Sequence, residues 1–216
     1  SKLLIVAART EGEKNDASGI TLFLVESDHQ DVEITKTSMV DSRNAANIQF
    51  NDVAVSSENI IGEENNGASV LEVVLDRAQI AISAEMLGNA SQAFDLTLEY
   101  LKERKQFGAV IGTFQALQHR AAEMYSELEL TKSSVIAACN AVDQNSNDLR
   151  RMASLAKFKS GETNYLITNE AVQMHGGVGV TDEYDVGLFM KRARVTEQIF
   201  GNSEYHIDRY ATLSDY

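Results

Sequence analysis

The chain has 216 residues, of which 44% are hydrophobic and 24% charged, and its formal net charge is −13. This acidic balance argues against binding to nucleic acid or to an anionic membrane surface, since both need basic patches, although a locally basic site for a small anion is still allowed. The single cysteine excludes an intrachain disulfide, and no stretch reaches the roughly 18 apolar residues of a membrane span.

Residues 1–62 have the pattern of a β-domain. Four runs rich in β-branched and aromatic residues are separated by turn-forming residues, which predicts an antiparallel meander. These runs are LLIVAAR, ITLFLVE, DVEITKTSM and NIQFNDVAV. Because the sequence opens inside the first run and without a methionine, we expect the natural protein to have upstream sequence.

From about residue 66 the hydrophobic period becomes that of a helix. Apolar residues such as Leu71, Leu75, Ile82 and Met86 recur at three- and four-residue steps. Five helices are predicted, at about 66–104, 113–143, 147–174, 183–199 and 202–213. The expected fold is α+β, with the remnant of an antiparallel β-domain at 1–62 and an up-down four-helix bundle at 63–216.

Two local features of the bundle can be predicted from its sequence. Cys139 lies in the run VIAACNAV, which favours a buried and inert thiol on a helix face. Asn147 or Asp148 is suited to cap the third long helix.

The segment RKQFG places Arg104 where a helix gives way to a glycine-containing turn. A guanidinium at such a position can form a forked pair of hydrogen bonds with a phosphate, with help from exposed backbone N–H groups. The alternative is a solvated arginine that the helix dipole favours at a C-terminus.

The segment QMHGGVGV is a second candidate site. Gly176 and Gly177 let another group approach the backbone closely, and Gln173 offers an amide. It is not a dinucleotide-binding fingerprint, because a helix and not a strand is predicted before it. The alternative is a glycine-rich helix terminus.

A third segment, IFGNSEYH, starts the last helix and contains His206, which is expected to be a surface or satisfied histidine. His119 and His175 have no metal-ligand spacing with each other or with Cys139. The sequence therefore predicts no metal site.

Together and in this order, these segments resemble the acyl-CoA dehydrogenase family over essentially the whole chain. VLDRAQIAISAEMLG is similar to the first bundle helix of that family, and RKQFG, FQALQ and QMHGGVGVTDEY are similar to its flavin-binding segments. The resemblance implies a tetramer that binds FAD between subunits, oxidises acyl-CoA to a 2-enoyl thioester and passes electrons to an electron-transferring flavoprotein. It also implies a bacterial cytoplasmic or mitochondrial matrix location.

The resemblance also implies roles for individual residues. Arg104 matches an arginine on the FAD diphosphate of a neighbouring subunit. The other positions matched to FAD contacts are Gln106, Phe107, Gln115, Gln173, Gly176, Gly177, Asn202 and Glu204. Arg77 matches a substrate-binding position.

The usual catalytic base of the family has no counterpart. Its Tyr-Glu-Gly-Thr segment corresponds to IFGNSEYH, where Gly201 replaces the glutamate or a deletion removes it. Some members carry the base on the first bundle helix, which corresponds to Asp76, one methylene shorter than glutamate. Three alternatives remain: Asp76 is the base, this chain is a base-less subunit that completes FAD sites in a hetero-oligomer, or another group serves, such as Glu204 or a residue of the upstream sequence.

Reoxidation by oxygen, as in an acyl-CoA oxidase, is a further alternative. We expect the 216 residues alone to be inactive, because the resemblance assigns the flavin-ring contacts mainly to upstream β-domain segments.

Overall fold

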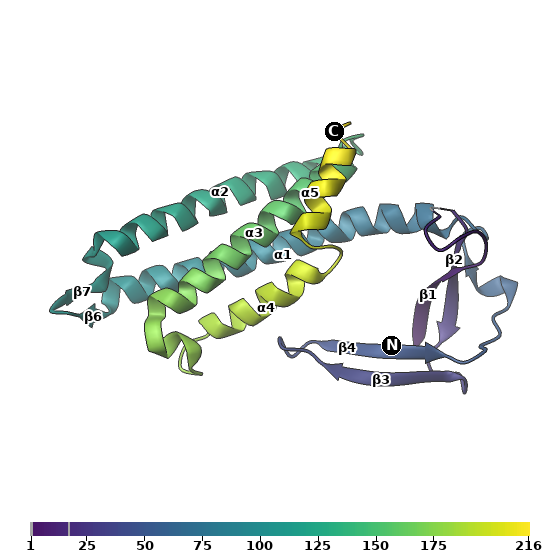
Figure 1. The fold of residues 1–216 in the computed structure, drawn as a ribbon, viewed down its shortest axis with the longest axis horizontal. Helices are drawn as coiled ribbons and strands as arrows, with labels where there is room; N and C mark the ends of the chain where they lie inside the picture. The colour runs from purple at the N-terminus through teal and green to yellow at the C-terminus, as the bar shows by residue number, and fades with distance from the viewer. Residues whose placement is uncertain (1, 17) are drawn as a thin grey trace. The chain divides into compact units, whose positions relative to one another are not determined.

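The computed structural model describes residues 2–16 and 18–216, which form two compact units, 1–75 and 76–216. Helix α1 (Gly67–Glu103) runs from the first unit into the second (Figure 1). The boundary between the two units, at 75/76, lies within α1. The change of hydrophobic period suggested a domain boundary 13 residues earlier, at 62/63.

The first unit contains two small antiparallel sheets. In one of them, β2 (Ile20–Glu26) lies between β1 (Leu3–Arg9) and the short β5 (Ile60–Ile61). The other is a hairpin of β3 (Val32–Ser38) and β4 (Asn44–Phe50). The prediction of one continuous meander was wrong, because both edges of β2 are occupied by β1 and β5.

The start of α1 packs closely against β2 of this sheet. Leu22 and Val25 of β2 are buried, and Gly67 lies so close that an added Cβ would come within 2.9 Å of the Ile20 carbonyl oxygen. The first turn of α1 therefore packs directly on β2.

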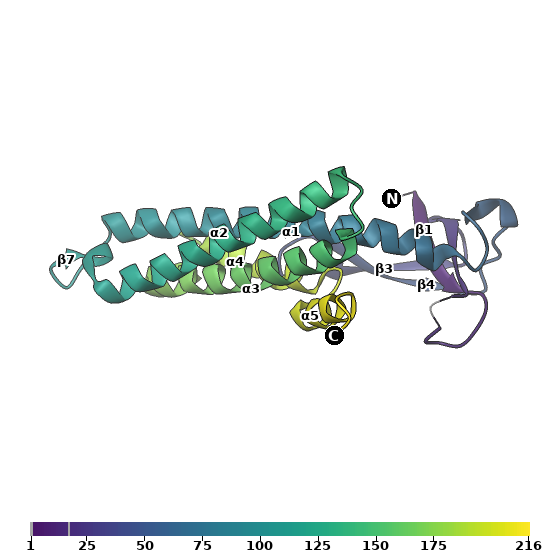
Figure 2. The same cartoon turned by 90° about the horizontal axis from the view of Figure 1, so that it is seen from above.

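The second unit is a helical bundle. Helices α1, α2 (Gln115–Asp143), α3 (Leu149–His175) and α4 (Val186–Gln198) lie side by side, and α5 (Ser203–Thr212) crosses α3 (Figures 1 and 2). Two-stranded β6 (Lys105–Gln106) and β7 (Ala109–Val110) connect α1 to α2. The predicted α+β fold class and four-helix bundle are confirmed.

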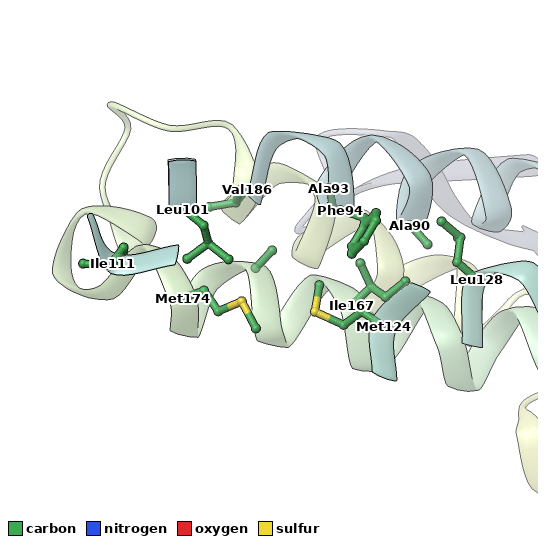
Figure 3. Packing of buried hydrophobic residues seen from close by; sticks show 11 residues of the cluster. Ala90, Ala93, Phe94, Leu101, Ile111, Met124, Leu128, Ile167, Met174 and Val186 are labelled. Carbon is green, nitrogen blue, oxygen red and sulfur yellow. The ribbon is translucent and has the colours of Figure 1, made fainter. Parts of the chain in front are cut away.

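The core of the bundle joins all four long helices (Figure 3). Met86, Met124 and Ile167 are at most 1% exposed, and small residues such as Ala93 and Ala171 let the helices approach closely. Two short 3-10 segments, Ile111–Thr113 and Gly176–Val180, close the same end of this core. No helix in residues 2–16 and 18–216 is long and apolar enough to cross a membrane.

Two local predictions were wrong. Cys139 is exposed: it lies at the edge of the buried stripe of α2, about 40° around the helix from Val135 and about 100° from Ala138. Asp148 does occupy the N-cap position of α3, but its carboxylate accepts a hydrogen bond from Arg151 at 2.8 Å, and no capping bond from it is seen in the described part of the chain.

Candidate functional site

The RKQFG segment forms a tight hairpin after the last turn of α1. Its two central residues, Phe107 and Gly108, both have positive φ, at 55° and 78°. This is the conformation of the two-residue turns that match the twist of antiparallel strands, and it is unfavourable for a phenylalanine. The Phe107 ring is 91% exposed and meets only the edge of Phe114, at 6.3 Å between ring centroids. The hairpin therefore holds an apolar ring outward just beyond the end of α1.

The glycine-rich turn follows the last residue of α3. Gly176 has φ 66° and ψ −144°, a region that only glycine enters readily. A Cβ added at Gly176 or Gly177 would meet open space, and both residues are exposed. Glycine is therefore needed at position 176 for the backbone path, and both glycines leave their peptide groups exposed.

A cluster of aromatic rings connects this turn to the end of α1. Tyr100 stacks on His175 with 4.2 Å between ring centroids, and its hydroxyl donates to the His175 carbonyl oxygen at 3.2 Å. Tyr184 packs edge-on against both rings. The hairpin and the glycine-rich turn consequently lie at one end of the bundle.

The groups at this end fit the diphosphate and ribose half of FAD. Arg104 and the amide residues Gln106, Gln115 and Gln173 are all exposed, and they provide a guanidinium and neutral donors beside open glycine backbone. The buried His175 Nε2 has no hydrogen-bond partner within the described residues. Burial also lowers the pKa of His175, so that its ring favours the neutral form. Its Nδ1–H donates to the Ala171 carbonyl oxygen at 2.7 Å, so Nε2 of the neutral ring is an acceptor; the donors available to an anion here are the Arg104 guanidinium, the glutamine amides and the open backbone.

Asn202 and Glu204 do not join this group. They lie at the start of α5, beyond α4, whose 13 residues span roughly 20 Å at 1.5 Å per residue. Asn202 caps α5 by accepting from the Tyr205 amide at 3.0 Å. Both line an open cleft of about 420 Å³ that Glu162, Glu197 and Arg194 also border. The predicted cofactor residues therefore lie in two separate sets on this chain.

The carboxylate of Asp76 lies inside the bundle. Asp76 is 3% exposed, and its Oδ1 accepts from Arg209 Nη2 at 2.5 Å while Oδ2 lies 3.8 Å from Arg150 Nε. Arg209 also donates to Gln79 Oε1 and Ser154 Oγ. Arg77, the next residue, is exposed. These contacts favour a structural ion pair for Asp76 over a role as catalytic base.

Gly201 lies in a turn that leaves no room for a side chain. Its φ is 106°, and an added Cβ would lie 2.4 Å from Tyr205 Cδ1 and 3.0 Å from His206 Nε2. The position that the family resemblance assigns to the base is thus closed by the ring of Tyr205.

Three residues that contact this turn were not indicated by any motif in the sequence: Lys157, Gln79 and the buried His206. Lys157 is 1% exposed and His206 is fully buried, although both residue types are usually found at surfaces. The helical period was the one available signal, because Lys157 falls on the buried face of α3 between Ala153 and Ser160.

His206 should make stability depend on pH. Burial is the main cause that lowers the pKa of His206 to about 4, and the nearby charges of Lys157 and Arg209 act in the same direction. The hydrogen bond to the Phe200 carbonyl oxygen and the charge of Asp76 act in the opposite direction. The unfolded state therefore takes up a proton near pH 6.5 and the folded state only near pH 4, so stability falls as the pH drops between these values. We expect this residue to account for a loss of about 3 kcal/mol, from 1.36 kcal/mol per pKa unit.

The measurement is urea unfolding at pH 7.5, 6 and 4.5 for the native chain, for His206→Gln and for His119→Gln, which alters an exposed histidine. The His206 variant should lose part of the pH slope and the His119 variant should keep it. Equal slopes in all three chains would contradict the assignment.

Comparisons with known proteins identify the family of this chain. The family model described as "Acyl-CoA dehydrogenase, C-terminal domain" matches residues 65–212. A probable acyl-CoA dehydrogenase of Bacillus subtilis is 34% identical over 94% of this chain and 54% of its own length. A subunit of the caffeyl-CoA reductase–Etf complex of Acetobacterium woodii is 34% identical over 93% of this chain and 53% of its own.

The solved structure of butyryl-CoA dehydrogenase from Megasphaera elsdenii superposes with a TM-score of 0.92, at 28% identity, over 100% of this chain and 57% of that one. The chain spans about half the length of the curated relatives it matches. It belongs to the acyl-CoA dehydrogenase family, and residues 65–212 form the C-terminal domain of that family.

Proposed function

We propose that this chain is a subunit of an FAD-dependent acyl-CoA dehydrogenase, and that its hairpin end contributes to a flavin site shared with another chain. The observation that carries the proposal is the meeting of Arg104, the exposed Phe107 ring and the open backbone of Gly176 and Gly177 at one end of the bundle. FAD, when bound, supplies a two-electron acceptor for the β-hydride of an acyl-CoA thioester.

The residues at the hairpin end would bind and orient the cofactor. The Arg104 guanidinium would neutralise diphosphate charge, and its planar fork of donors suits a phosphate better than the single ammonium of a lysine does. The amides of Gln106, Gln115 and Gln173 satisfy neutral acceptors without adding charge. Phe107 offers an apolar face that excludes water from the contact.

For the proton-transfer step, we propose that the base comes from outside this chain. Dehydrogenation needs a positioned carboxylate near the substrate α-carbon. Asp76 is engaged by two arginines inside the bundle, and Gly201 has no space for a side chain. These contacts support the alternative of a base-less subunit in a hetero-oligomer, with a tetramer as the expected assembly.

We further propose an electron-transferring flavoprotein as the electron acceptor, in the bacterial cytoplasm or the mitochondrial matrix. The name of the Acetobacterium woodii relative, a subunit of an Etf complex, supports this choice. Rapid reoxidation of the reduced assembly by air would instead indicate an oxidase.

Arg104→Ala should weaken FAD binding about 100-fold. Loss of two charge-assisted hydrogen bonds is worth about 3 kcal/mol, and each 1.4 kcal/mol is a factor of ten. Retained flavin can be measured by absorbance near the flavin band after dialysis of the assembly that the chain forms in its host. Arg104→Lys should recover only part of the affinity, since an ammonium is not a planar fork.

Arg151→Ala is the matched control, because Arg151 pairs with Asp148 in the first turn of α3, at the other end of that helix. An assembly of unaltered chains that never takes up flavin would end the proposal. Equal losses in the Arg104 and Arg151 variants would remove Arg104 from the site.

A further inference from the structure

The turn between α4 and α5 has an unusual backbone path. Phe200 and Gly201 follow each other with φ of 61° and 106°, before Asn202 returns to extended backbone and caps α5. A phenylalanine in the left-handed region costs on the order of 1 kcal/mol or more, so such a path persists only where its surroundings fix it.

Lys157 of α3 fixes this turn from one side. Its Nζ donates to the Glu197 carbonyl oxygen at 2.9 Å and to the Gly201 carbonyl oxygen at 2.8 Å. One amine thereby connects the last turn of α4 to the residue that starts the approach to α5. Because the side chain is 1% exposed, its charged form loses hydration, and burial lowers the pKa of Lys157 to about 8. The two hydrogen bonds to carbonyl oxygens offset the cost of burying this amine.

Side chains from two other helices bind the carbonyl group of Phe200. The Phe200 carbonyl oxygen accepts from His206 Nε2 of α5 at 3.0 Å and from Gln79 Nε2 of α1 at 3.4 Å. Three carbonyl oxygens between the end of α4 and the start of α5, those of Glu197, Phe200 and Gly201, are thus bound by buried side chains from α3, α5 and α1. The backbone of the turn is held by side chains and not by a regular ladder.

We propose that Lys157 is a positioning residue, which holds the α4–α5 turn so that Asn202 and the rings of Phe200 and Tyr205 face outward in a fixed arrangement. The rings of Phe200 and Tyr205 are 42% and 50% exposed. This inference rests on the proposed function, because that function makes the turn one of the two sets of residues facing a shared flavin site. The holding of the turn itself can be tested without flavin.

The first test is amide hydrogen exchange of the purified chain with Lys157→Met, which keeps the length of the side chain and removes its donors. Exchange of the amides in residues 199–205 should become at least about tenfold faster, because two buried carbonyl groups lose their partner and the turn opens more often. Lys159→Met is the control: it alters the same helix but breaks a surface pair with Glu127. It should leave these amides unchanged.

Chemical rescue separates positioning from a general loss of packing. In a Cys139→Ser background, Lys157→Cys can be alkylated with 2-bromoethylamine in denaturant and refolded, which restores an amine at nearly the length of lysine. Exchange in residues 199–205 should return to within about threefold of the native rate, whereas alkylation with ethyl iodide, which adds no amine, should leave it fast. If Lys157→Met does not fold, this pair of adducts carries the comparison.

Exchange that rises no more in residues 199–205 than elsewhere, or that recovers equally with both adducts, would overturn the inference. In the flavin-loaded assembly, Lys157→Met should lower kcat by about tenfold or more at a KM within threefold of the native value. An assembly without flavin, with the turn still loosened in the variant, would leave Lys157 as the holder of the turn and would count against the proposed function alone.

Discussion

Asp76→Asn should lower the free energy of unfolding by about 3 kcal/mol, one of the two largest effects expected in this chain. Removal of one partner from a buried ion pair leaves an uncompensated charge, which typically costs 3–5 kcal/mol. The affected charge is Arg209, whose side chain is 13% exposed. We place the loss at the lower end of this range because Arg150, the second arginine beside Asp76, is 44% exposed and can be solvated by water. Chemical unfolding of the purified chain measures it.

Glu99→Gln is the matched control for this prediction. Glu99 pairs with Lys102 at 2.9 Å, but both side chains are about two-thirds exposed, so we expect a change below about 1 kcal/mol. A native-like stability of Asp76→Asn would show that the pair with Arg209 contributes little. If the same variant also abolished flavin bleaching by acyl-CoA in the assembly, Asp76 would have to be the base.

The sequence was most informative where a regular period extends over many residues. The absence of proline and the spacing of apolar residues in α1, α2 and α3 placed their ends within about two residues of the observed ones. The strand pairing was less accessible, because periodicity says which residues form strands but not which edges meet. The two-residue strand β5, which occupies the second edge of β2, is too short to have a pattern.

The candidate site shows the same limit at the level of single residues. The family resemblance implied that Arg104 and Gln173 act together, and Tyr100 stacked on His175 brings their segments to one end. Asp76 was identified as a candidate because of its neighbour Arg77, yet its partner is Arg209, 133 residues away. No local pattern indicates a contact at that separation, and the same holds for Lys157 and Gly201.

Gly201→Ala should lower the free energy of unfolding by about 3 kcal/mol. A side chain at φ 106° is strained, which costs about 1–3 kcal/mol, and the new Cβ would lie 2.4 Å from the Tyr205 ring and 3.0 Å from His206 Nε2. The Tyr205 ring is 50% exposed and can swing outward, but His206 is fully buried and cannot. Gly88→Ala is the opposite control, because a Cβ there meets open space on a helix and should stabilise by about 1 kcal/mol.

The functional consequence concerns the missing base. Gly201→Glu restores a carboxylate at the position that the family resemblance assigns to it, and yet we expect no gain in flavin bleaching by acyl-CoA. The carboxylate can enter only by displacing Tyr205 and by changing the backbone that Lys157 holds, and a misplacement of about 1 Å costs on the order of 100-fold in rate. Addition of Tyr205→Ala to Gly201→Ala should recover only the contact with the Tyr205 ring, and should leave the contact with His206 and the backbone strain. Full activity of Gly201→Glu with unchanged stability would show that the turn accepts a side chain, and that the base was lost from this chain by substitution alone.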